Sequence, residues 1–281
     1  MIEPRIAQTA GDVGGHYDEL DETYRSIWGE HVHHGLWRSG RETPEEATVA
    51  LVALVAERLA LEPGQAVCDI GCGYGASAAH LAATRMVAVT GLTLSEAQAR
   101  IAAQREAAAG PLAFHRRDWL DNGLADAGFD RAYAIESSEH MVDKARFFAE
   151  AWRVLKPGGR LVVCAWLART DPNGFEIRHL LEPICREGRL PSMGSREDYE
   201  ALAAEAGFVA RGYEEIGPQV RRTWSICARR VAKRLVSDRG FRRFAFARTT
   251  RNRSFLLSLP RLMLALKTGA MRYGVFVWDK P

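Results

Sequence analysis

The sequence lacks the features of a membrane-spanning or disulfide-stapled protein. No stretch of about 18 uncharged apolar residues occurs, so we expect no spanning helix. Residues 1–15 contain acids and no apolar core, which argues against a secretory signal and for a cytoplasmic location. The 5 cysteines fit neither a zinc site nor a disulfide framework, so we expect reduced thiols at Cys68, Cys72, Cys164, Cys185 and Cys227.

Charge is unevenly spread along the chain, although the net charge of the 281 residues is only +3. Between Arg221 and Arg253 there are twelve arginine or lysine residues and one acid, Asp238, which leaves the rest of the chain net negative. Such a basic block is typical of a site for an anionic partner, namely a phosphorylated substrate, a membrane surface or a nucleic acid. A solvated helical face or a contact within a homo-oligomer would explain it equally well.

The middle of the chain alternates predicted strands with predicted helices. Apolar runs that end in turn residues predict the strands. The alternation implies right-handed βαβ units and a mostly parallel sheet, hence a Rossmann-like α/β fold with helices on both faces. We expect strands at residues 66–70, 86–90, 112–117, 129–135 and 160–166, with further strands near 209–216 and 273–278.

This pattern divides the chain into four segments. Residues 1–61 form an N-terminal helical lid segment, and residues 62–219 form the core. Residues 220–270 form a basic helical cap, in which a leucine-rich helix is expected over residues 254–266. Residues 271–281 contain the final strand. The cap is therefore inserted between two strands, where it would cover the sheet.

The loop that directly follows the first strand carries the strongest functional signal. It reads Asp-Ile-Gly-Cys-Gly-Tyr-Gly over residues 69–75, and a helix follows it. Glycines let the chain turn tightly and let a ligand approach the backbone. The acid two residues before Gly71 separates this loop from the GxGxxG fingerprint of dinucleotide-binding folds. A carboxylate at that place suits a cationic or amine-bearing ligand.

In this loop the sequence resembles the class I methyltransferases, whose cofactor S-adenosylmethionine carries an amino group and a sulfonium but no phosphate. Asp69, Gly71 and Gly73 match the family's loop around the methionine part of the cofactor. Residues 91–98, Gly-Leu-Thr-Leu-Ser-x-x-Gln, resemble a subgroup in which threonine and glutamine replace the acid that holds the ribose. The resemblance implies that the ribose and adenine ends are held by Leu92, Thr93, Gln98, Asp118 and Trp119.

Three further motifs narrow the resemblance to the gamma-tocopherol methyltransferase-like family. They are Trp-Gly-Glu-His-Val-His-His-Gly at residues 28–35, Glu-Ser-Ser-Glu-His-Met-x-x-Lys at residues 136–144, and Lys-Pro at residues 280–281. The family includes C-methyltransferases of prenylated phenols and N-methyltransferases of plant indole alkaloids. The resemblance implies a small-molecule substrate, although this cap is more basic than that of the tocopherol enzymes.

Glu136 and His140 are the candidates for substrate orientation or general base. They follow the fourth predicted strand, and open α/β sheets bind ligands at the carboxyl ends of their strands. A base works best with a pKa near the operating pH, which histidine meets and a buried glutamate can reach. The alternative for Glu136 is a purely local hydrogen-bonding role, and we interpret Glu139 as structural.

The aromatic and histidine-rich residues upstream predict a lid over the cofactor. We expect Tyr17 and His34 to contact the cofactor, and Trp28, His33 and Trp37 to close the lid with them. The aromatic rings would screen the methyl group from water and line an apolar pocket. The alternative is an aromatic packing stripe. No metal site is expected, because no carboxylate or cysteine pattern accompanies the histidines at positions 31, 33 and 34.

Together these motifs predict a small-molecule methyltransferase that methylates carbon in a prenylated or aromatic specialised metabolite. The acceptor would be hydrophobic or amphiphilic, and anionic if the basic cap binds it; the cap would also suit a peripheral membrane contact. Nitrogen or oxygen methylation and C-methylation of a prenyl diphosphate are the alternatives within the enzyme class. A non-catalytic cofactor-binding module and a nucleic-acid methyltransferase are less favoured, because the loop is intact and no nucleic-acid-binding module is recognisable.

Overall fold

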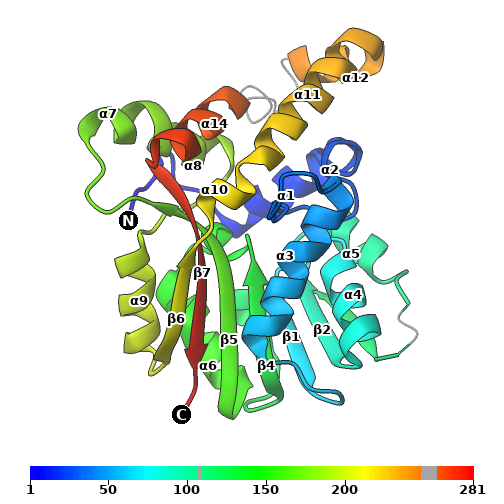
Figure 1. Ribbon diagram of the computed structural model, residues 1–281, viewed down its shortest axis with the longest axis vertical. Coiled ribbons are helices and arrows are strands. Elements are labelled where there is room, and N and C mark those ends of the chain that lie inside the picture. Colours follow the sequence, from blue (N-terminus) through cyan, green and yellow to red (C-terminus); the bar gives the residue numbers. More distant parts are fainter. Residues whose placement is uncertain (107–108, 248–257) are drawn as a thin grey trace.

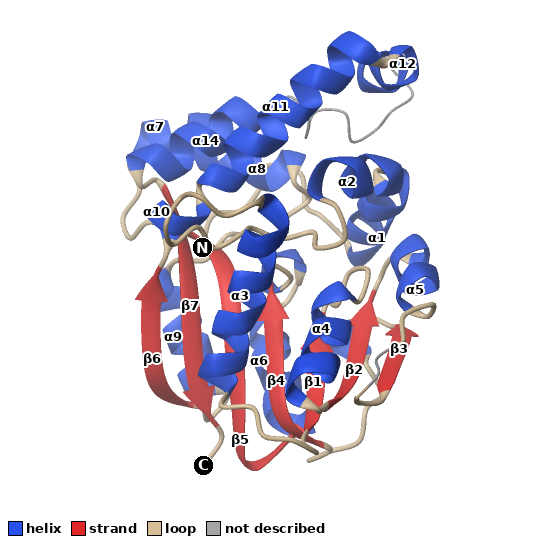
Figure 2. Ribbon diagram, turned by 45° about the vertical axis from the view of Figure 1, so that its right-hand side comes forward, coloured by secondary structure: helices blue, strands red, loops and turns tan. Residues whose placement is uncertain are grey.

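The computed structural model describes residues 1–106, 109–247 and 258–281, and seven strands in these ranges form one sheet (Figures 1 and 2). The strand order is β3-β2-β1-β4-β5-β7-β6. The first five strands pair in parallel, and β7 runs antiparallel between β5 and β6. The expected α/β sheet is therefore confirmed. The strands are β1 Ala66–Ile70, β2 Ala88–Thr93, β3 Leu112–Arg116, β4 Phe129–Ile135, β5 Leu155–Ala168, β6 Val209–Glu215 and β7 Met271–Asp279.

Helices cover both faces of the sheet. On one face, α3 (Pro44–Leu59) and α4 (Ala76–Arg85) share a buried apolar cluster with alternate residues of the central strands. On the other face, α6 (Lys144–Val154) and α9 (Arg196–Glu205) share a second cluster with the residues of opposite parity. This alternation follows from the strand period of two. Helix α5 (Glu96–Ala102) contacts β2 and β3.

The covering helices begin at residues whose side chains can cap a free helix end. Thr43 and Ser195 each accept a hydrogen bond from the backbone three residues later and form a capping box with α3 and α9. Asp143 accepts from the Arg146 N–H at the start of α6. Such a cap satisfies a backbone donor that has no partner inside the helix, and it stabilises the helix by about 1 kcal/mol.

A helical layer lies over the carboxyl ends of β1 to β5 (Figure 2). The N-terminal helices α1 and α2 belong to it, as do the helices between β6 and β7, so the inserted cap is confirmed. A third buried cluster joins these helices to one another and to the end of β5. The layer comprises α1 Ala10–Glu19, α2 Asp21–Trp28, α7 Gly174–Glu176, the π-helical turn Ile177–Leu181, α8 Glu182–Glu187, α10 Gly217–Val220, α11 Arg222–Ser237, α12 Arg239–Phe246 and α14 Leu259–Thr268.

Two parts of this layer differ from the sequence prediction. The helical segment Gly174–Glu187 was not predicted, because it consists of short pieces broken by a π-helical turn and by Pro183. The leucine-rich helix expected over residues 254–266 is observed as Leu259–Thr268, and residues 254–257 lie outside the described residues. In the described ranges, no helix is both long and apolar enough to cross a membrane.

Candidate active site

Two neighbouring cavities lie between the carboxyl ends of the strands and the helical layer. The first is bordered by the loops after β1, β2 and β4 and by α1. The second lies beside it, between the end of β5 and helices α2 and α11. Most predicted site residues line the first cavity: Tyr17, Gly71, Gly73, Leu92, Thr93, Gln98, Trp119, Glu136 and His140. Three predicted site residues do not line this cavity, namely Asp69, Asp118 and His34. The cavity wall also contains Arg117, Ser137 and Met141, which we did not assign to the site from the sequence.

The glycine-rich loop after β1 forms the floor of the first cavity. Gly71 has a φ of 84°, and a Cβ at this position would collide with the side chain of Ser137. Gly73 has a φ of 53°, and the nearest atom that a Cβ would meet there is Gln98 Nε2, at 4.0 Å. Both positions therefore need glycine for their backbone conformation, and Gly73 leaves room for a ligand against the main chain.

Asp69 lies at the end of β1, in a space that adjoins the first cavity and shares Gly71 and Gly73 with it. Its side chain is buried, and Tyr133 OH donates to its Oδ2 atom at 2.6 Å. Burial raises the pKa of Asp69 to about 7, which the Tyr133 hydrogen bond only partly offsets. A buried carboxyl of this kind fits a cationic group such as the amino group of S-adenosylmethionine, which would hold it ionised.

Thr93 and Gln98 supply polar groups after β2, at the place where related folds have an acid that holds the ribose. Thr93 Oγ1 donates to Gln98 Oε1 at 2.7 Å, so the amide is oriented with Nε2 as its remaining donor. Ser95 Oγ accepts from Gln98 N at 3.1 Å and caps α5. It also donates to Asp18 Oδ1 at 2.5 Å, which ties the lid helix α1 to this loop. The arrangement fits ribose hydroxyl groups, which can accept from the amide.

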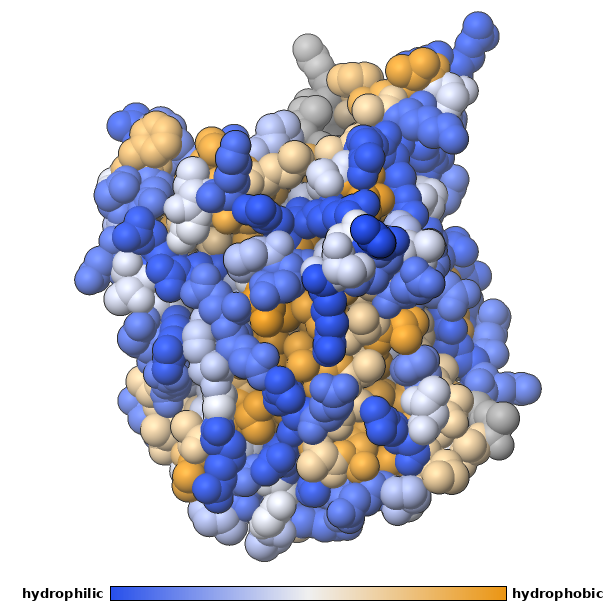
Figure 3. All heavy atoms as spheres, in the orientation of Figure 1, coloured by the Kyte–Doolittle hydropathy of each residue, from blue (hydrophilic) through white to orange (hydrophobic). Residues whose placement is uncertain are grey.

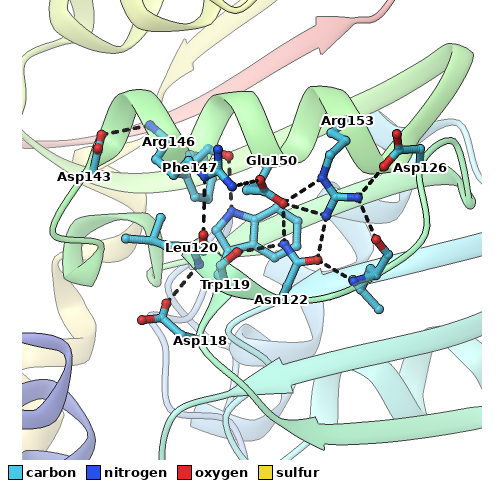
Figure 4. A network of polar contacts seen from close by, with 11 residues as sticks. Asp118, Trp119, Leu120, Asn122, Asp126, Asp143, Arg146, Phe147, Glu150 and Arg153 are labelled. Carbon is cyan, nitrogen blue, oxygen red and sulfur yellow. Dashed lines mark hydrogen bonds and ion pairs between the residues drawn. The ribbon is translucent and has the colours of Figure 1, made fainter.

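Trp119 forms a wall of the first cavity and is held by a polar network on the side facing α6 (Figure 4). Its Nε1 donates to the Phe147 carbonyl at 3.2 Å, and its own carbonyl accepts from Asn122 Nδ2 at 2.8 Å. Asn122 in turn donates to Glu150, which also pairs with Arg153. Because polar contacts hold the ring in place, the part of the ring that lines the cavity is a preformed surface for a flat group such as adenine.

Asp118 and His34 hold structure beside the cavity instead of lining it. Asp118 Oδ1 accepts from Leu120 N at 2.9 Å and caps the short turn that carries Trp119; its side chain borders a shallow groove with Arg116 and Arg117. His34 is buried, and its ring meets Trp224 edge-on with a centroid distance of 5.2 Å. Their assignment to cofactor binding stays a prediction.

Glu136 accepts four hydrogen bonds and connects the lid segment to the sheet. Its donors are His34 N at 2.7 Å, His34 Nδ1 at 2.9 Å, Trp166 Nε1 at 3.0 Å and Tyr273 OH at 2.8 Å. Burial alone would raise its pKa, but the charge and hydrogen bonds of His34, together with the charge of His33, lower it to about 2. A carboxylate with its lone pairs occupied and so low a pKa is suited to positioning and poorly suited to accepting a proton.

His140 stands where the two cavities meet, because both are lined by it. Its Nδ1 lies 3.4 Å from the Arg189 carbonyl, which can only accept, so Nδ1 carries the proton. In this tautomer Nε2 has the lone pair of the ring, and this lone pair accepts a hydrogen bond from Tyr17 OH at 2.9 Å. Burial lowers the pKa of His140 to about 4, so the ring is neutral at pH 7.

The second cavity has aromatic walls and acidic groups on its floor. Glu139 lies there, and its Oε1 accepts from Trp166 N at 2.5 Å. Burial raises the pKa of Glu139 to about 7, so this residue, which we interpreted as structural, borders the cavity as a second titratable group. The ring walls are Tyr17, Tyr24, Trp28, Trp166 and Trp224. Of these, sequence reasoning missed Tyr24, Trp166 and Trp224; only Trp166, at the carboxyl end of its strand, carried a positional signal.

The rest of the predicted lid lies beside the cavities. Tyr17 stacks on Tyr24 with a centroid distance of 5.3 Å, so α1 and α2 hold each other over the site. His33 is hydrogen-bonded to Ser77, and Trp37 Nε1 donates to Thr223 on α11. Some of these residues thus line a cavity and others form packing contacts, and a lid over the cofactor stays a prediction. Across the part of the chain that the structure describes, no three histidine, cysteine or acidic residues are grouped as metal ligands.

Comparison with known proteins identifies the class and then the family. The fold and the cavity after β1 are those of a class I S-adenosylmethionine-dependent methyltransferase. Residues 5–240 match the family model described as mycolic acid cyclopropane synthetase, and the chain belongs to this family. Its cofactor is S-adenosylmethionine, and it is an enzyme of small-molecule methylation, as the sequence predicted.

Its relatives act on several kinds of molecule, according to their names. The chain is 34% identical over 226 residues to 27-O-demethylrifamycin SV methyltransferase of Amycolatopsis mediterranei, covering 79% of this chain and 82% of the relative. It is 29% identical over 289 residues to the chloroplastic tocopherol O-methyltransferase of Arabidopsis thaliana, covering 94% and 80%. The cyclopropane synthase MmaA2 of Mycobacterium tuberculosis shares its fold, with a TM-score of 0.84 at 23% identity over 98% of this chain and 100% of that one.

Proposed function

We propose that the chain methylates a hydroxyl oxygen of an aromatic or otherwise hydrophobic natural product. The observation that carries this proposal is His140, a neutral base whose Nε2 lone pair stands at the junction of the two cavities. Carbon methylation of an aromatic ring, which we expected from the sequence, also releases a proton that His140 would accept, so the choice of oxygen over carbon rests on the relatives. The name of the rifamycin relative, a 27-O-demethylrifamycin SV methyltransferase, supports the oxygen acceptor.

The first cavity would hold the cofactor along its length. Asp69 would pair with the amino group, Gln98 Nε2 would donate to the ribose, and Trp119 would lie against the adenine. When bound, S-adenosylmethionine supplies an electrophilic methyl carbon, so that an O–CH₃ bond forms as the S–CH₃ bond breaks. The methyl end would then face His140 and the second cavity, because the sugar and adenine partners lie on the other side.

The residues around the second cavity would bind the acceptor, take its proton and exclude water. Tyr17 OH donates to His140 Nε2, and an acceptor hydroxyl would take the place of this donor. His140 would receive the hydroxyl proton as the oxygen is methylated, which is general-base catalysis at a positioned side chain. Glu136 would act as a positioning residue, since it holds His34 of the lid against Trp166 and Tyr273. The aromatic walls keep bulk water away.

A prenyl diphosphate acceptor is less well supported by the charges around the second cavity. The charged side chains in its wall are Glu136 and Glu139, which would repel a diphosphate. Arginine and lysine residues of the cap line neither cavity within the described part of the chain. A neutral phenol or alcohol fits these walls better.

The proposal is tested by offering S-adenosylmethionine with four acceptors: a prenylated hydroquinone, a simple phenol, an indole amine and geranyl diphosphate. We expect turnover of a hydroxylated aromatic and a methoxy signal in the NMR spectrum of the product. The matched control is the same aromatic with its hydroxyl already methylated, which should not react. A new methyl group on carbon or nitrogen, or turnover of geranyl diphosphate alone, would keep the enzyme class and overturn the oxygen acceptor.

A further inference from the structure

Among the described residues of the basic block, the cations of α11 and α12 line neither cavity, and several of them face outward. On α11, Trp224, Cys227 and Val231 are buried against the helical layer at helical spacing. Arg229 and Lys233 therefore lie on the opposite, exposed face. The cations of α11 and α12 are thus available to a partner outside the molecule, and the acceptor cavity does not use them.

Several of these cations have no acidic partner. Arg230 and Arg234 pair with Glu45 and Asp238. Over the described residues, no carboxylate lies within ion-pair distance of Arg229, Lys233, Arg239 or Arg243 (all four exposed). A group of like charges without counter-charges produces a positive potential that attracts an anionic surface.

Apolar side chains are exposed at the same place. The end of α11 and α12 projects from the body of the protein (Figure 1), and in Figure 3 hydrophobic and hydrophilic atoms lie side by side on this projecting end. Val236 is 82% exposed and Phe246 is 63% exposed there. A nucleic acid or a soluble anion has no use for an exposed valine, whereas a lipid bilayer accepts apolar groups below its charged headgroups.

We propose that the projecting end of α11 and α12 docks on an anionic lipid bilayer, with the cations at the headgroups and Val236 inserted at the boundary of the acyl chains. Each arginine or lysine near such a surface contributes about fivefold to the affinity. Because α11 also carries Trp224 into the second cavity, twelve residues before Val236, docking would place that cavity about 18 Å along the helix from the bilayer, where hydrophobic acceptors dissolve.

The proposal is tested by co-sedimentation of the full chain with vesicles, without cofactor or acceptor. Vesicles of phosphatidylcholine alone are compared with vesicles that also contain phosphatidylglycerol, at low and high salt. We expect binding to the phosphatidylglycerol vesicles that weakens with salt. The triple variant Arg229→Glu, Lys233→Glu, Arg243→Glu should lose on the order of a hundredfold in affinity, and Val236→Asp should also weaken binding.

The matched control carries the same charge change away from the projecting end, as Arg5→Glu, Arg41→Glu, Arg100→Glu. It should bind vesicles nearly as well as the wild type, and Met86→Asp is the matching control for Val236→Asp. Equal losses in test and control variants would overturn the docking site. So would absent vesicle binding at low salt, RNA binding without vesicle binding, or a dimer in solution that the triple variant dissociates. Methylation of a soluble acceptor should be unchanged in the triple variant, so the outcome is independent of the proposed reaction.

Discussion

Replacing Asp69 by alanine is expected to abolish measurable binding of S-adenosylhomocysteine, the demethylated cofactor. The carboxylate is buried and its ligand group would be an ammonium, so its loss leaves an unpaired charge inside the site. Breaking such a buried pair costs about 3–5 kcal/mol, a loss of hundredfold or more in Kd. The measurement is isothermal titration calorimetry, and wild-type affinity in the variant would remove Asp69 from the cofactor site.

The pH dependence of the same titration tests whether the ionised carboxylate of Asp69 binds the ligand. Burial raises the pKa of Asp69 to about 7, so before the ligand binds the carboxyl is increasingly protonated as the pH falls below that value. Affinity should then drop by about tenfold per pH unit below the pKa and level off above it. Tyr133→Phe removes the hydrogen bond that lowers this pKa, so the decline should begin at a higher pH. Asp69→Asn should bind weakly at every pH.

Replacing His140 by alanine should lower kcat by about 10²- to 10⁴-fold, the usual contribution of a positioned general base. Cofactor affinity should change little, because Asp69, Gln98 and Trp119 remain. In the wild type at saturating cofactor, the rate should fall on the acid side as the pH passes through about 4, where His140 becomes protonated. The measurement is the pH profile of kcat. A rate that persists in the alanine variant would exclude the base.

Two controls separate the roles of neighbouring residues. His80→Ala changes a histidine on α4 that lines neither cavity, and its turnover should match the wild type. Glu136→Gln should lower both turnover and thermal stability, since a neutral amide cannot accept from all four donors and an unsatisfied buried donor costs about 1–3 kcal/mol. A variant that loses turnover with unchanged stability would instead favour a direct chemical role for Glu136.

The sheet and the cofactor loop were predictable because local sequence decides them. The predicted strand at residues 129–135 coincides with β4, since its apolar residues, Phe129 and those at 132–135, follow turn residues. Gly71, Gly73 and Gln98 converge in one cavity because the carboxyl ends of parallel strands meet at one edge. A local sequence pattern is sufficient to predict a feature that residues close together in the sequence form.

The parts that depend on distant contacts were not predictable in this way. The bond of His34 to Glu136, 102 residues away, forms because two buried polar groups satisfy each other, and no local pattern marks it. The cofactor contact expected of His34 stays a prediction. Trp224 reaches the second cavity only through the packing of α11, and no local signal marks it. The same packing turns Arg229 and Lys233 outward, although the sequence placed the cap correctly over the sheet.

The most direct test of the site is a crystal structure of the chain with S-adenosylhomocysteine. We expect the amino group of the ligand within hydrogen-bonding distance of Asp69 and the ribose at Gln98. The adenine should lie against Trp119, and the sulfur should face His140 and the second cavity. A ligand bound elsewhere, or bound in the first cavity with its sulfur turned away from His140, would contradict this expectation.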